Sequence, residues 1–543
     1  MWKISSTLTG FVISLISMLL EVLGFWHNKL WNLILSRRPE AQVLEQMRNA
    51  HTYDEWLDLA YNLDNLLGND LWRANPKASM YDYKLISERL DAIMEAKEME
   101  DVNALTNILR SGLVRNLGNI ANKKLFTYTG YGLRPKLRVI TKSELRTKFL
   151  IEKYNMEVID SLHYLLNHPS STLSTQAKLD LVHDTRQSYG LSALVLQGGI
   201  LFGLCHLGVV RALHQHQLLP RIITGVGVGA LIATLVSVHR DDELPEFLNG
   251  KGIDLSAFAK QRPPEQYQGL QRLKRLITKG YLLDIQVLQQ VVKDNIGDLT
   301  FEEAYARTRR VLNITLHSND KYVPTLFNFL TTPNVLIWSA ACASNALPGF
   351  YEEVQLMCKN EKGEIVPWLP TGTPIRWKSW TSTPREEREA PYTRVSELFN
   401  VNHFIVSQAR PYIAPFMSQD IHHGAHSVRN KLLRITGYEI RHRLSQLETV
   451  GLLPPLLRRM LMLDDRRLMN SEIITIVPDL RVHDFWKLFV DAPRSREDIE
   501  YWSRKGEVST WFALPLVRQR CGVEFILDGV YEVLFQSRRV RKL

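Results

Sequence analysis

Two glycine-rich turns are the segments of this 543-residue sequence whose residue types and spacing could support chemistry. Gly198-Gly199 follows the apolar run 192–197, and Gly225-Val226-Gly227-Val228-Gly229 follows the shorter apolar run 221–224. A glycine-rich turn between a strand and a helix can cradle a phosphate with backbone N–H groups at the helix N-terminus. The same turn can instead form a nucleophile elbow, G-x-S-x-G, in which a serine sits at the tight strand-to-helix junction.

The nucleotide-binding alternative fits these turns poorly. In the dinucleotide fingerprint G-x-G-x-x-G, two residues separate the second glycine from the third, whereas only one residue separates Gly227 from Gly229. The turn also lacks the lysine with which a P-loop contacts phosphates. The elbow is therefore favoured over a nucleotide site.

The elements that must position these turns alternate between strand and helix. Each glycine turn leads from a short apolar run into an apolar helical stretch, and this unit occurs twice in succession, which predicts a parallel α/β sheet. Residues 40–115 and 144–168 are predicted to be helical, with Thr52 as a helix N-cap. Beyond the two turns, the sequence predicts helices at 204–216 and 230–238, and strands at 311–315 and 404–406.

The residues around the turns resemble the patatin-like phospholipase family, in particular its fungal triacylglycerol-lipase branch. The similar segments are LVLQGGILFGLCHLGVVRAL from Leu194, TFEEAY from Thr300, LTTPNV from Leu330, WSAACASNALPG from Trp338, SELFNVNHFIVSQ from Ser396, LETVGLLP from Leu447 and GEVSTW from Gly506. The resemblance covers residues 50 to 530 and implies a patatin-like parallel sheet flanked by helices, preceded by a helical domain. It implies ester hydrolysis by a Ser–Asp dyad, with no cofactor or metal.

The resemblance assigns roles to the glycines. Gly198, Gly199 and Gly203 correspond to the G-G-x-x-x-G loop whose N–H groups stabilise an oxyanion, and Val228 follows the nucleophile position. Gly225 and Gly229 correspond to the outer glycines of the elbow.

The sequence departs from the family pattern at both positions of the dyad. The elbow carries Gly227 where the nucleophilic serine is expected, and the interval 380–390 contains no Asp-Gly where the family has its aspartate. A gapless count places Thr383 near that aspartate position. Asp528-Gly529 occurs too late for the family order and is interpreted as an ordinary turn.

Two functional hypotheses follow from this departure. In the first, the chain is a lipid-binding or regulatory pseudoenzyme of triacylglycerol metabolism that has lost its catalytic dyad. In the second, it is an active lipid acyl hydrolase that uses residues outside the expected dyad. Ser237 lies some ten residues into the following helix and points elsewhere, Ser339 and Ser344 are interpreted as packing or turn residues, and His206 is interpreted as a buried histidine. The oxyanion glycines could persist either to hold a lipid carbonyl or phosphate, or because the turn requires them.

The N-terminus favours a membrane. Residues 4–26 are nearly all apolar and carry one charge, Glu21, and Trp2, Trp26 and Trp31 could anchor at the headgroup level. A bilayer span, a hairpin in one leaflet, a cleaved signal peptide and a buried core helix are alternatives, of which an uncleaved anchor or hairpin is preferred. We expect the endoplasmic reticulum or lipid droplets as the location, with the bulk of the chain facing the cytosol.

The charge of the chain suggests an anionic neighbour. The formal net charge is +10, and basic residues gather in 427–468 and at the C-terminus. No zinc knuckle, RNP motif or helix-turn-helix pattern accompanies them, so anionic lipid is preferred over nucleic acid as the partner. We expect a membrane or droplet surface, neutral lipid or phospholipid and an active lipase paralogue as candidate partners.

Composition supports a large folded protein. Apolar residues make up 45% and charged residues 23% of the chain, which excludes a wholly disordered, collagenous or coiled-coil protein. The predicted division is a membrane anchor or hairpin at 1–38, a helical domain at 39–185, a patatin-like domain at 186–415 and a basic, mainly helical extension at 416–543.

Overall fold

A computed structural model of the chain defines the fold. It describes residues 39–122, 125, 148–169, 173–198, 203–249, 285–345 except 319 and 321, 354–378 except 371, 374 and 376, 385–409, 472–478 and 496–542, with scattered residues between 439 and 450. The predicted membrane element at 1–38 lies outside these residues. No helix in the described part combines the length and hydrophobicity that crossing a bilayer requires.

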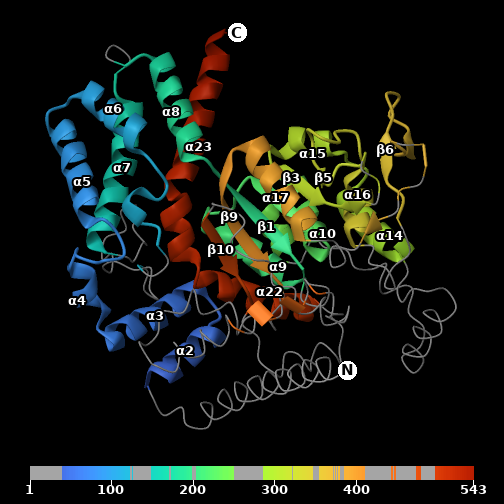
Figure 1. Ribbon diagram of the computed structural model, residues 1–543, viewed down its shortest axis with the longest axis horizontal. Coiled ribbons are helices and arrows are strands. Elements are labelled where there is room, and N and C mark those ends of the chain that lie inside the picture. The colour runs from blue at the N-terminus through green and yellow to red at the C-terminus, as the bar shows by residue number, and fades with distance from the viewer. Residues whose placement is uncertain are drawn as a thin grey trace, which may run out of the picture.

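A six-stranded sheet occupies the centre of the molecule (Figure 1). Its strand order is β10-β9-β1-β2-β3-β5, in which every neighbouring pair is parallel except β3 with β5. The strands are β1 (Leu191–Gln197), β2 (Ile222–Val226), β3 (Val311–Thr315), β5 (Leu326–Phe327), β9 (Val401–Gln408) and β10 (Glu472–Ile476). Short β4 (His317–Ser318) pairs with β8 (Trp377–Lys378), and β6 (Met357–Lys359) forms a hairpin with β7 (Ile365–Pro367).

Helices flank this sheet and build a separate N-terminal layer. The N-terminal helices are α2 (Pro39–Asn49), α3 (Tyr53–Leu67), α4 (Asn69–Ala74), α5 (Tyr83–Glu98), α6 (Val102–Gly112), the 3₁₀ turn η1 (Leu117–Asn119), α7 (Phe149–Asn167) and α8 (Thr175–Tyr189). The later helices are α9 (Cys205–Gln215), α10 (Val228–Val238), α11 (Leu244–Leu248), α14 (Ile285–Ile296), α15 (Phe301–Thr308), α16 (Ile337–Asn345), α17 (Arg385–Phe399), α22 (Arg496–Trp511) and α23 (Leu514–Lys542). The chain is thus a mixed α/β protein with a mainly parallel sheet and an N-terminal helical domain.

The strand predictions are confirmed, with small changes at the ends. The runs predicted at 192–197, 221–224 and 404–406 form β1, β2 and β9. In β1 the side chains of residues 193–196 are fully buried, as expected for a strand covered on both faces. The predicted N-cap is also confirmed, because the Thr52 hydroxyl accepts a hydrogen bond from the Glu55 N–H.

One strand of the sheet comes from the region predicted to be mainly helical. β10 pairs with β9, and its Ile474 and Ile476 are fully buried in the main core. The chain therefore returns to the central sheet about sixty residues after β9, as the element bounds show. A five-residue apolar run carries too little periodicity to distinguish a strand from a helix.

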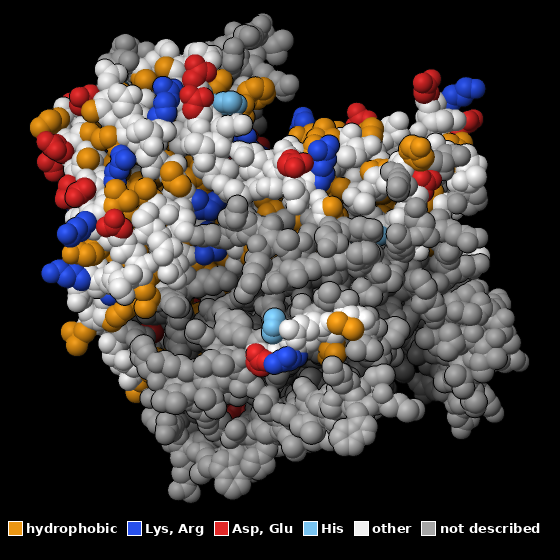
Figure 2. All heavy atoms as spheres, viewed as in Figure 1, with side chains coloured by type: hydrophobic (Ala, Val, Ile, Leu, Met, Phe, Trp, Pro, Cys, Tyr) orange, Lys and Arg blue, Asp and Glu red, His pale blue; other side chains and the backbone are white. Residues whose placement is uncertain are grey.

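Segments from the two ends of the chain pack together. The Trp56 ring of α3 lies 6.3 Å from the Trp511 ring at the end of α22, and 5.1 Å from Phe512 in an edge-to-face arrangement. Helix α23 runs between the N-terminal helices and the sheet and packs along α8 (Figure 1). On the face shown in Figure 2, the described surface of the N-terminal helices mixes basic, acidic and apolar side chains. The N-terminal layer therefore depends on the C-terminal helices.

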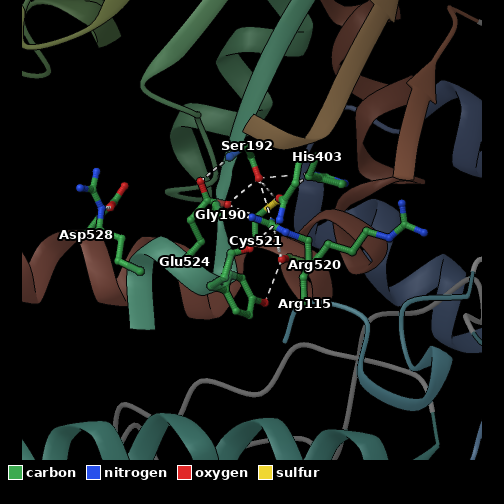
Figure 3. A network of polar contacts seen from close by, with 11 residues as sticks. Arg115, Gly190, Ser192, His403, Arg520, Cys521, Glu524 and Asp528 are labelled. Carbon is green, nitrogen blue, oxygen red and sulfur yellow. Dashed lines mark hydrogen bonds and ion pairs between the residues drawn. The ribbon is translucent and has the colours of Figure 1, made fainter. Parts of the chain in front are cut away.

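A buried ion pair fixes this junction at the amino end of β1 (Figure 3). Arg115, which follows α6, donates to the Glu524 carboxylate of α23 at 3.0 Å. The same guanidinium donates to the backbone carbonyls of Gly190 and Arg520, both at 2.8 Å, and to the Ser192 hydroxyl at 3.0 Å. Both charged side chains are at least nine-tenths buried. A buried charge needs several such partners, because burial without them costs several kcal/mol.

The same network contains a serine, a histidine and a cysteine, but its burial argues against catalysis. Ser192 Oγ lies 3.1 Å from His403 Nδ1 and 3.3 Å from Cys521 Sγ, and all three side chains are almost inaccessible to solvent. Burial raises the pKa of the Cys521 thiol to about 12, so the thiolate is absent at neutral pH. Burial also raises the pKa of Glu524, with Arg115 opposing the rise. The network is structural.

Replacing Arg115 with methionine should lower the free energy of unfolding by about 3–5 kcal/mol, because Glu524 would stay buried without its counter-ion. The control is Arg110→Met, which removes a pair with Asp184 at 3.3 Å whose two side chains are both about half exposed. That change should cost less than about 1 kcal/mol. Urea unfolding followed by tryptophan fluorescence measures both, and equal losses would contradict the structural role assigned to Arg115.

Candidate lipid-binding site at the glycine elbow

The predicted elbow turn lies between β2 and α10. Gly227 caps α10 with φ 60° and ψ −128°, a backbone conformation that residues with a side chain rarely adopt. Its carbonyl accepts the Ala230 N–H at 2.9 Å, which closes the first turn of the helix. No described atom lies within 4 Å of the place that a Cβ at Gly227 would take, so none of the described residues fills the space of a nucleophilic side chain.

The outer glycines of the turn are fixed by packing. A Cβ on Gly225 would overlap the backbone of Ala230, and a Cβ on Gly229 would overlap the carbonyl of Leu196 in β1. Both positions therefore require glycine for the strand and the helix to approach this closely, whether or not the site performs chemistry.

Ser344 contacts the elbow directly. Its hydroxyl accepts the Gly227 N–H at 3.0 Å and donates to the Thr315 carbonyl, also at 3.0 Å, so it links the turn to the end of β3. Ser339, on the same helix α16, has the same kind of bonding: it accepts the Met357 N–H at 3.1 Å and donates to the Leu336 carbonyl at 2.8 Å. Both serines are backbone braces, and only Ser344 braces the elbow.

The described ends of the glycine loop lie beside the elbow strand. Gly198 follows the end of β1 with φ 75°, and Gly203 precedes α9. Gly199, the middle residue assigned to the oxyanion loop, lies outside the described residues. The Gly203 carbonyl accepts the His206 N–H at 3.0 Å, which fixes the C-terminal end of the loop to the first turn of α9.

His206 is buried as predicted, and its ring contacts strand β9. Its Nδ1 lies 2.8 Å from the Ser407 hydroxyl of β9. Nε2 is buried and has no hydrogen-bond partner among the described residues. Burial lowers the pKa of His206 to about 4, against the smaller opposing effect of Gly198 and Gln197, and the ring is neutral at physiological pH.

The expected aspartate position cannot be placed. Thr383 lies outside the described residues, between β8 and α17. Helix α17, which follows it, is nevertheless tied to this edge of the sheet, because Gln197 donates to the Tyr392 hydroxyl. Gln408 of β9 donates to the Gln197 side chain at 3.3 Å, so these side chains form a polar layer where β1 and β9 end.

The interpretation of Asp528-Gly529 as a turn is wrong. Both residues lie inside the 29-residue helix α23, and Asp528 pairs with Arg186. A Cβ on Gly529 would meet no described atom within 4 Å, so this glycine marks no tight turn. The pair belongs to the junction with the N-terminal helices, which leaves Asp528 without a role at the elbow.

The similarity of the chain to known proteins matches this geometry. The patatin-like phospholipase family model matches residues 194–368, and a domain of unknown function, DUF3336, matches residues 33–187. Triacylglycerol lipase ptl1 of Schizosaccharomyces pombe is 35% identical over 503 residues, which cover 92% of this chain and 86% of that protein. The chain belongs to the patatin-like triacylglycerol lipase family.

Other members of the family show the same relation. Triacylglycerol lipase 3 of Saccharomyces cerevisiae is 30% identical over 98% of this chain and 94% of that protein. Triacylglycerol lipase SDP1L of Arabidopsis thaliana is 34% identical over 91% of this chain, which spans 59% of that relative. The family therefore includes fungal and plant triacylglycerol lipases, and the N-terminal helices of this member correspond to DUF3336.

Sequence reasoning did not find three contacts of this lipase-family site. Ser344 at the elbow, Ser407 beside His206 and the Gln197–Gln408 pair were interpreted otherwise or not singled out. The contacts of Ser407 and of the Gln197–Gln408 pair follow from the parallel pairing of β1 with β9. In that pairing Leu196 lies opposite Ser407, and Gln197 lies opposite Gln408. Polar residues at the ends of two predicted strands were the available signal, since such ends meet at one edge of a parallel sheet.

His206 should make the stability of this family member depend on pH. Above about pH 6.5 both states are neutral; as pH falls towards 4, the unfolded chain binds a proton that the folded chain cannot accept. The folded state should therefore lose about 2–3 kcal/mol between pH 7 and pH 4.5 through this group. Urea unfolding at both pH values should show a smaller loss for His206→Gln, and equal losses in the two proteins would contradict the assignment.

Proposed function

We propose that this chain is a membrane- or lipid-droplet-associated protein of triacylglycerol metabolism that binds lipid at its elbow without cleaving it. The observation that carries the proposal is Gly227, which stands at the nucleophile position of an elbow whose outer glycines and open space are retained. The relatives carry the name triacylglycerol lipase, which indicates a glycerolipid ligand.

Ester cleavage by the family mechanism requires an oxygen nucleophile and a group that accepts its proton. Gly227 provides no oxygen. The hydroxyl of Ser344 is close to the elbow, but its proton is donated to the Thr315 carbonyl and its oxygen accepts the Gly227 N–H. A carbonyl in that position orients the hydroxyl without acting as a general base, so Ser344 is a brace and no activated nucleophile.

Lipid binding needs only the groups that would have held the ester. Backbone N–H groups of the glycine loop, at Gly198, Gly199 and Gly203, and of Val228 at the start of α10 are the proposed donors to a lipid carbonyl or phosphate oxygen. The open space at Gly227 would accept the carbonyl carbon. These groups need no cofactor or metal.

The proposed location follows from the N-terminus and the basic segments. The apolar residues 4–26 would insert into a membrane or droplet monolayer, and the basic residues within 427–468 would approach anionic headgroups. An active lipase paralogue is the proposed protein partner, because a lipid-binding member without activity could deliver or withhold substrate.

An active hydrolase is the second candidate function, favoured by the names of the relatives and by the position of Ser344 beside the elbow. The two candidates differ in what Ser344 should do. Substitution of Ser344 removes the same hydrogen bonds in either case. Turnover of the substrate requires its hydroxyl only if Ser344 is the nucleophile.

The purified chain should show no hydrolysis of triolein or of a short-chain nitrophenyl ester above background, and no fluorophosphonate labelling. Loss of the nucleophile costs on the order of 10⁶ in turnover in serine hydrolases, and Gly227→Ser alone should not restore it without a base. Adding Thr383→Asp with Pro384→Gly tests the aspartate position given by the gapless count.

Matched serine variants decide between the candidates if activity is found. Ser344→Ala and Ser339→Ala remove equivalent hydrogen bonds from one helix and should cost similar stability, about 1–3 kcal/mol. Wild-type turnover that survives Ser339→Ala and disappears in Ser344→Ala would overturn the pseudoenzyme proposal. Robust turnover from Gly227→Ser alone would show that a base is already present.

Residues 1–36 should hold a fluorescent reporter on the endoplasmic reticulum or on lipid droplets, because the segment is nearly continuous apolar sequence flanked by tryptophan and arginine. A variant segment with Leu19→Asp and Leu20→Asp should leave the membrane. Fluorescence microscopy measures both, and a wild-type reporter that stays diffuse or is secreted would contradict the proposed anchor.

A further inference from the structure

Three leucines are exposed where two N-terminal helices meet. Leu66 and Leu67 end α3, and Leu71 lies in the short helix α4, with 86% of its surface accessible to solvent. Gly68 ends α3 and begins α4 with φ 66°, so the chain turns sharply between the leucines. We call Leu66, Leu67 and Leu71 the leucine corner. Apolar side chains that are exposed together on a protein surface mark a site of contact more often than isolated ones do.

The leucine corner is held in place by buried contacts with α7. Arg73 of α4 pairs with Glu152 at 3.0 Å, and both side chains are buried. Its guanidinium also lies 4.5 Å from the ring centroid of Phe149, which is about half exposed and adds an apolar side chain beside α4. Lys148 donates to the Asn75 carbonyl at 2.9 Å, directly after α4. Helix α4 is therefore fixed to the start of α7, and the leucines are exposed on a rigid base.

The leucine corner lies in the part of the fold that follows the proposed membrane anchor. Twelve residues separate the apolar segment 4–26 from the start of α2 at Pro39, and α2 packs against α3. A segment of that length spans at most about 40 Å. Insertion of residues 4–26 would therefore keep α2 and α3 within that distance of the lipid surface. Figure 1 shows α2, α3 and α4 next to one another along one edge of the molecule.

The charges around the leucine corner favour a neutral lipid surface. Between residues 65 and 76, every described side chain that is exposed is uncharged. The sequence adds one acid in this interval, Asp70, and the first exposed base after it is Lys77. Anionic headgroups attract clusters of basic residues, which the described part of this surface lacks. Exposed leucines gain instead from burial among acyl chains, which requires no charge on the lipid.

We propose that the leucine corner is a docking surface that inserts Leu66, Leu67 and Leu71 into a zwitterionic phospholipid surface. The proposal rests on the proposed function, which brings the chain to a membrane or lipid droplet, and it names the described residues that contact the lipid there. A rigid corner loses little conformational freedom on insertion, so most of the gain from leucine burial is kept. The contact would also orient the chain, because two separate points of attachment restrict rotation about the anchor.

The test uses the full chain with a fluorescent NBD label at position 71, bound to phosphatidylcholine vesicles. The label is attached through Leu71→Cys in a Cys358→Ser background, because the three other cysteines are buried. The matched control is Tyr322→Cys, whose side chain is exposed to 84%, compared with 86% for Leu71, and lies between β4 and β5. Vesicles should shift the emission at position 71 to the blue, and lipid with a spin-labelled acyl chain should quench about half of it. Position 322 should show neither change.

A second pair of variants separates insertion of the leucine corner from attachment through the anchor. Leu66→Ser with Leu67→Ser should reduce the quenching at position 71 about threefold, because polar side chains lose the gain from burial. Leu330→Ser is the control, since Leu66 and Leu330 are equally exposed, at 53%, and Leu330 lies beyond β5. It should leave the quenching unchanged, as should about 0.5 M NaCl, which screens charges only. Quenching that disappears in salt would overturn the assignment to a neutral surface.

The contradicting results differ in what they overturn. Quenching at position 71 that does not exceed quenching at position 322 on the vesicle-bound chain overturns the docking surface and leaves the proposed function intact. A blue-shifted emission at position 71 before vesicles are added shows that protein, such as a second copy of the chain, covers the leucine corner, and this also overturns the docking surface. A chain that does not bind the vesicles overturns the proposed location, and the docking surface with it.

Discussion

The burial of Arg115 and Glu524 is the constraint on which the arrangement of the layers depends. A guanidinium and a carboxylate that are both removed from water must satisfy their hydrogen bonds within the protein. The groups come from three distant parts of the chain: the segment after α6, the start of β1 and helix α23. Each of these segments supplies hydrogen bonds that the other two do not. The N-terminal helical domain and the C-terminal helix therefore act as one support for the sheet (Figure 3).

This support and the candidate site act on the same two strands at opposite ends. At the amino end, Ser192 of β1 and His403 of β9 join the network around Arg115. At the carboxyl end, the same two strands present Gln197 and Ser407, which contact α17 and His206. Parallel pairing keeps both ends in register. A site at the carboxyl end of a parallel sheet needs strands that do not slide, and polar contacts at both ends oppose sliding more effectively than apolar packing alone, because they are directional.

Local patterns predicted the elements that lie next to one another along the chain. Strand–glycine turn–helix units follow from apolar runs and glycines, and they produced β1, β2, α9 and α10. Contacts between residues far apart in the sequence could not be predicted from these local patterns. Arg115 and Glu524 are separated by 409 residues, and no spacing rule connects such positions. Asp528 was misread because Asp-Gly favours turns locally, whereas the pairing of Asp528 with Arg186 and the packing of α23 on α8 maintain a helix there. The specific contact of Ser344 with the elbow could not be predicted, because it depends on where α16 packs.

The elbow itself explains how a member of a lipase family could lose its nucleophile without losing its fold. At φ 60° and ψ −128°, a serine would hold a strained backbone, at a cost of about 1–2 kcal/mol, which a hydrolase accepts because the strain exposes the reactive oxygen. Glycine adopts the same geometry without that cost. The brace from Ser344 and the close packing at Gly225 and Gly229 do not involve the missing side chain, so they keep the turn in place. With glycine in place of the serine that the family pattern expects, this position has no side-chain hydroxyl and carries less backbone strain.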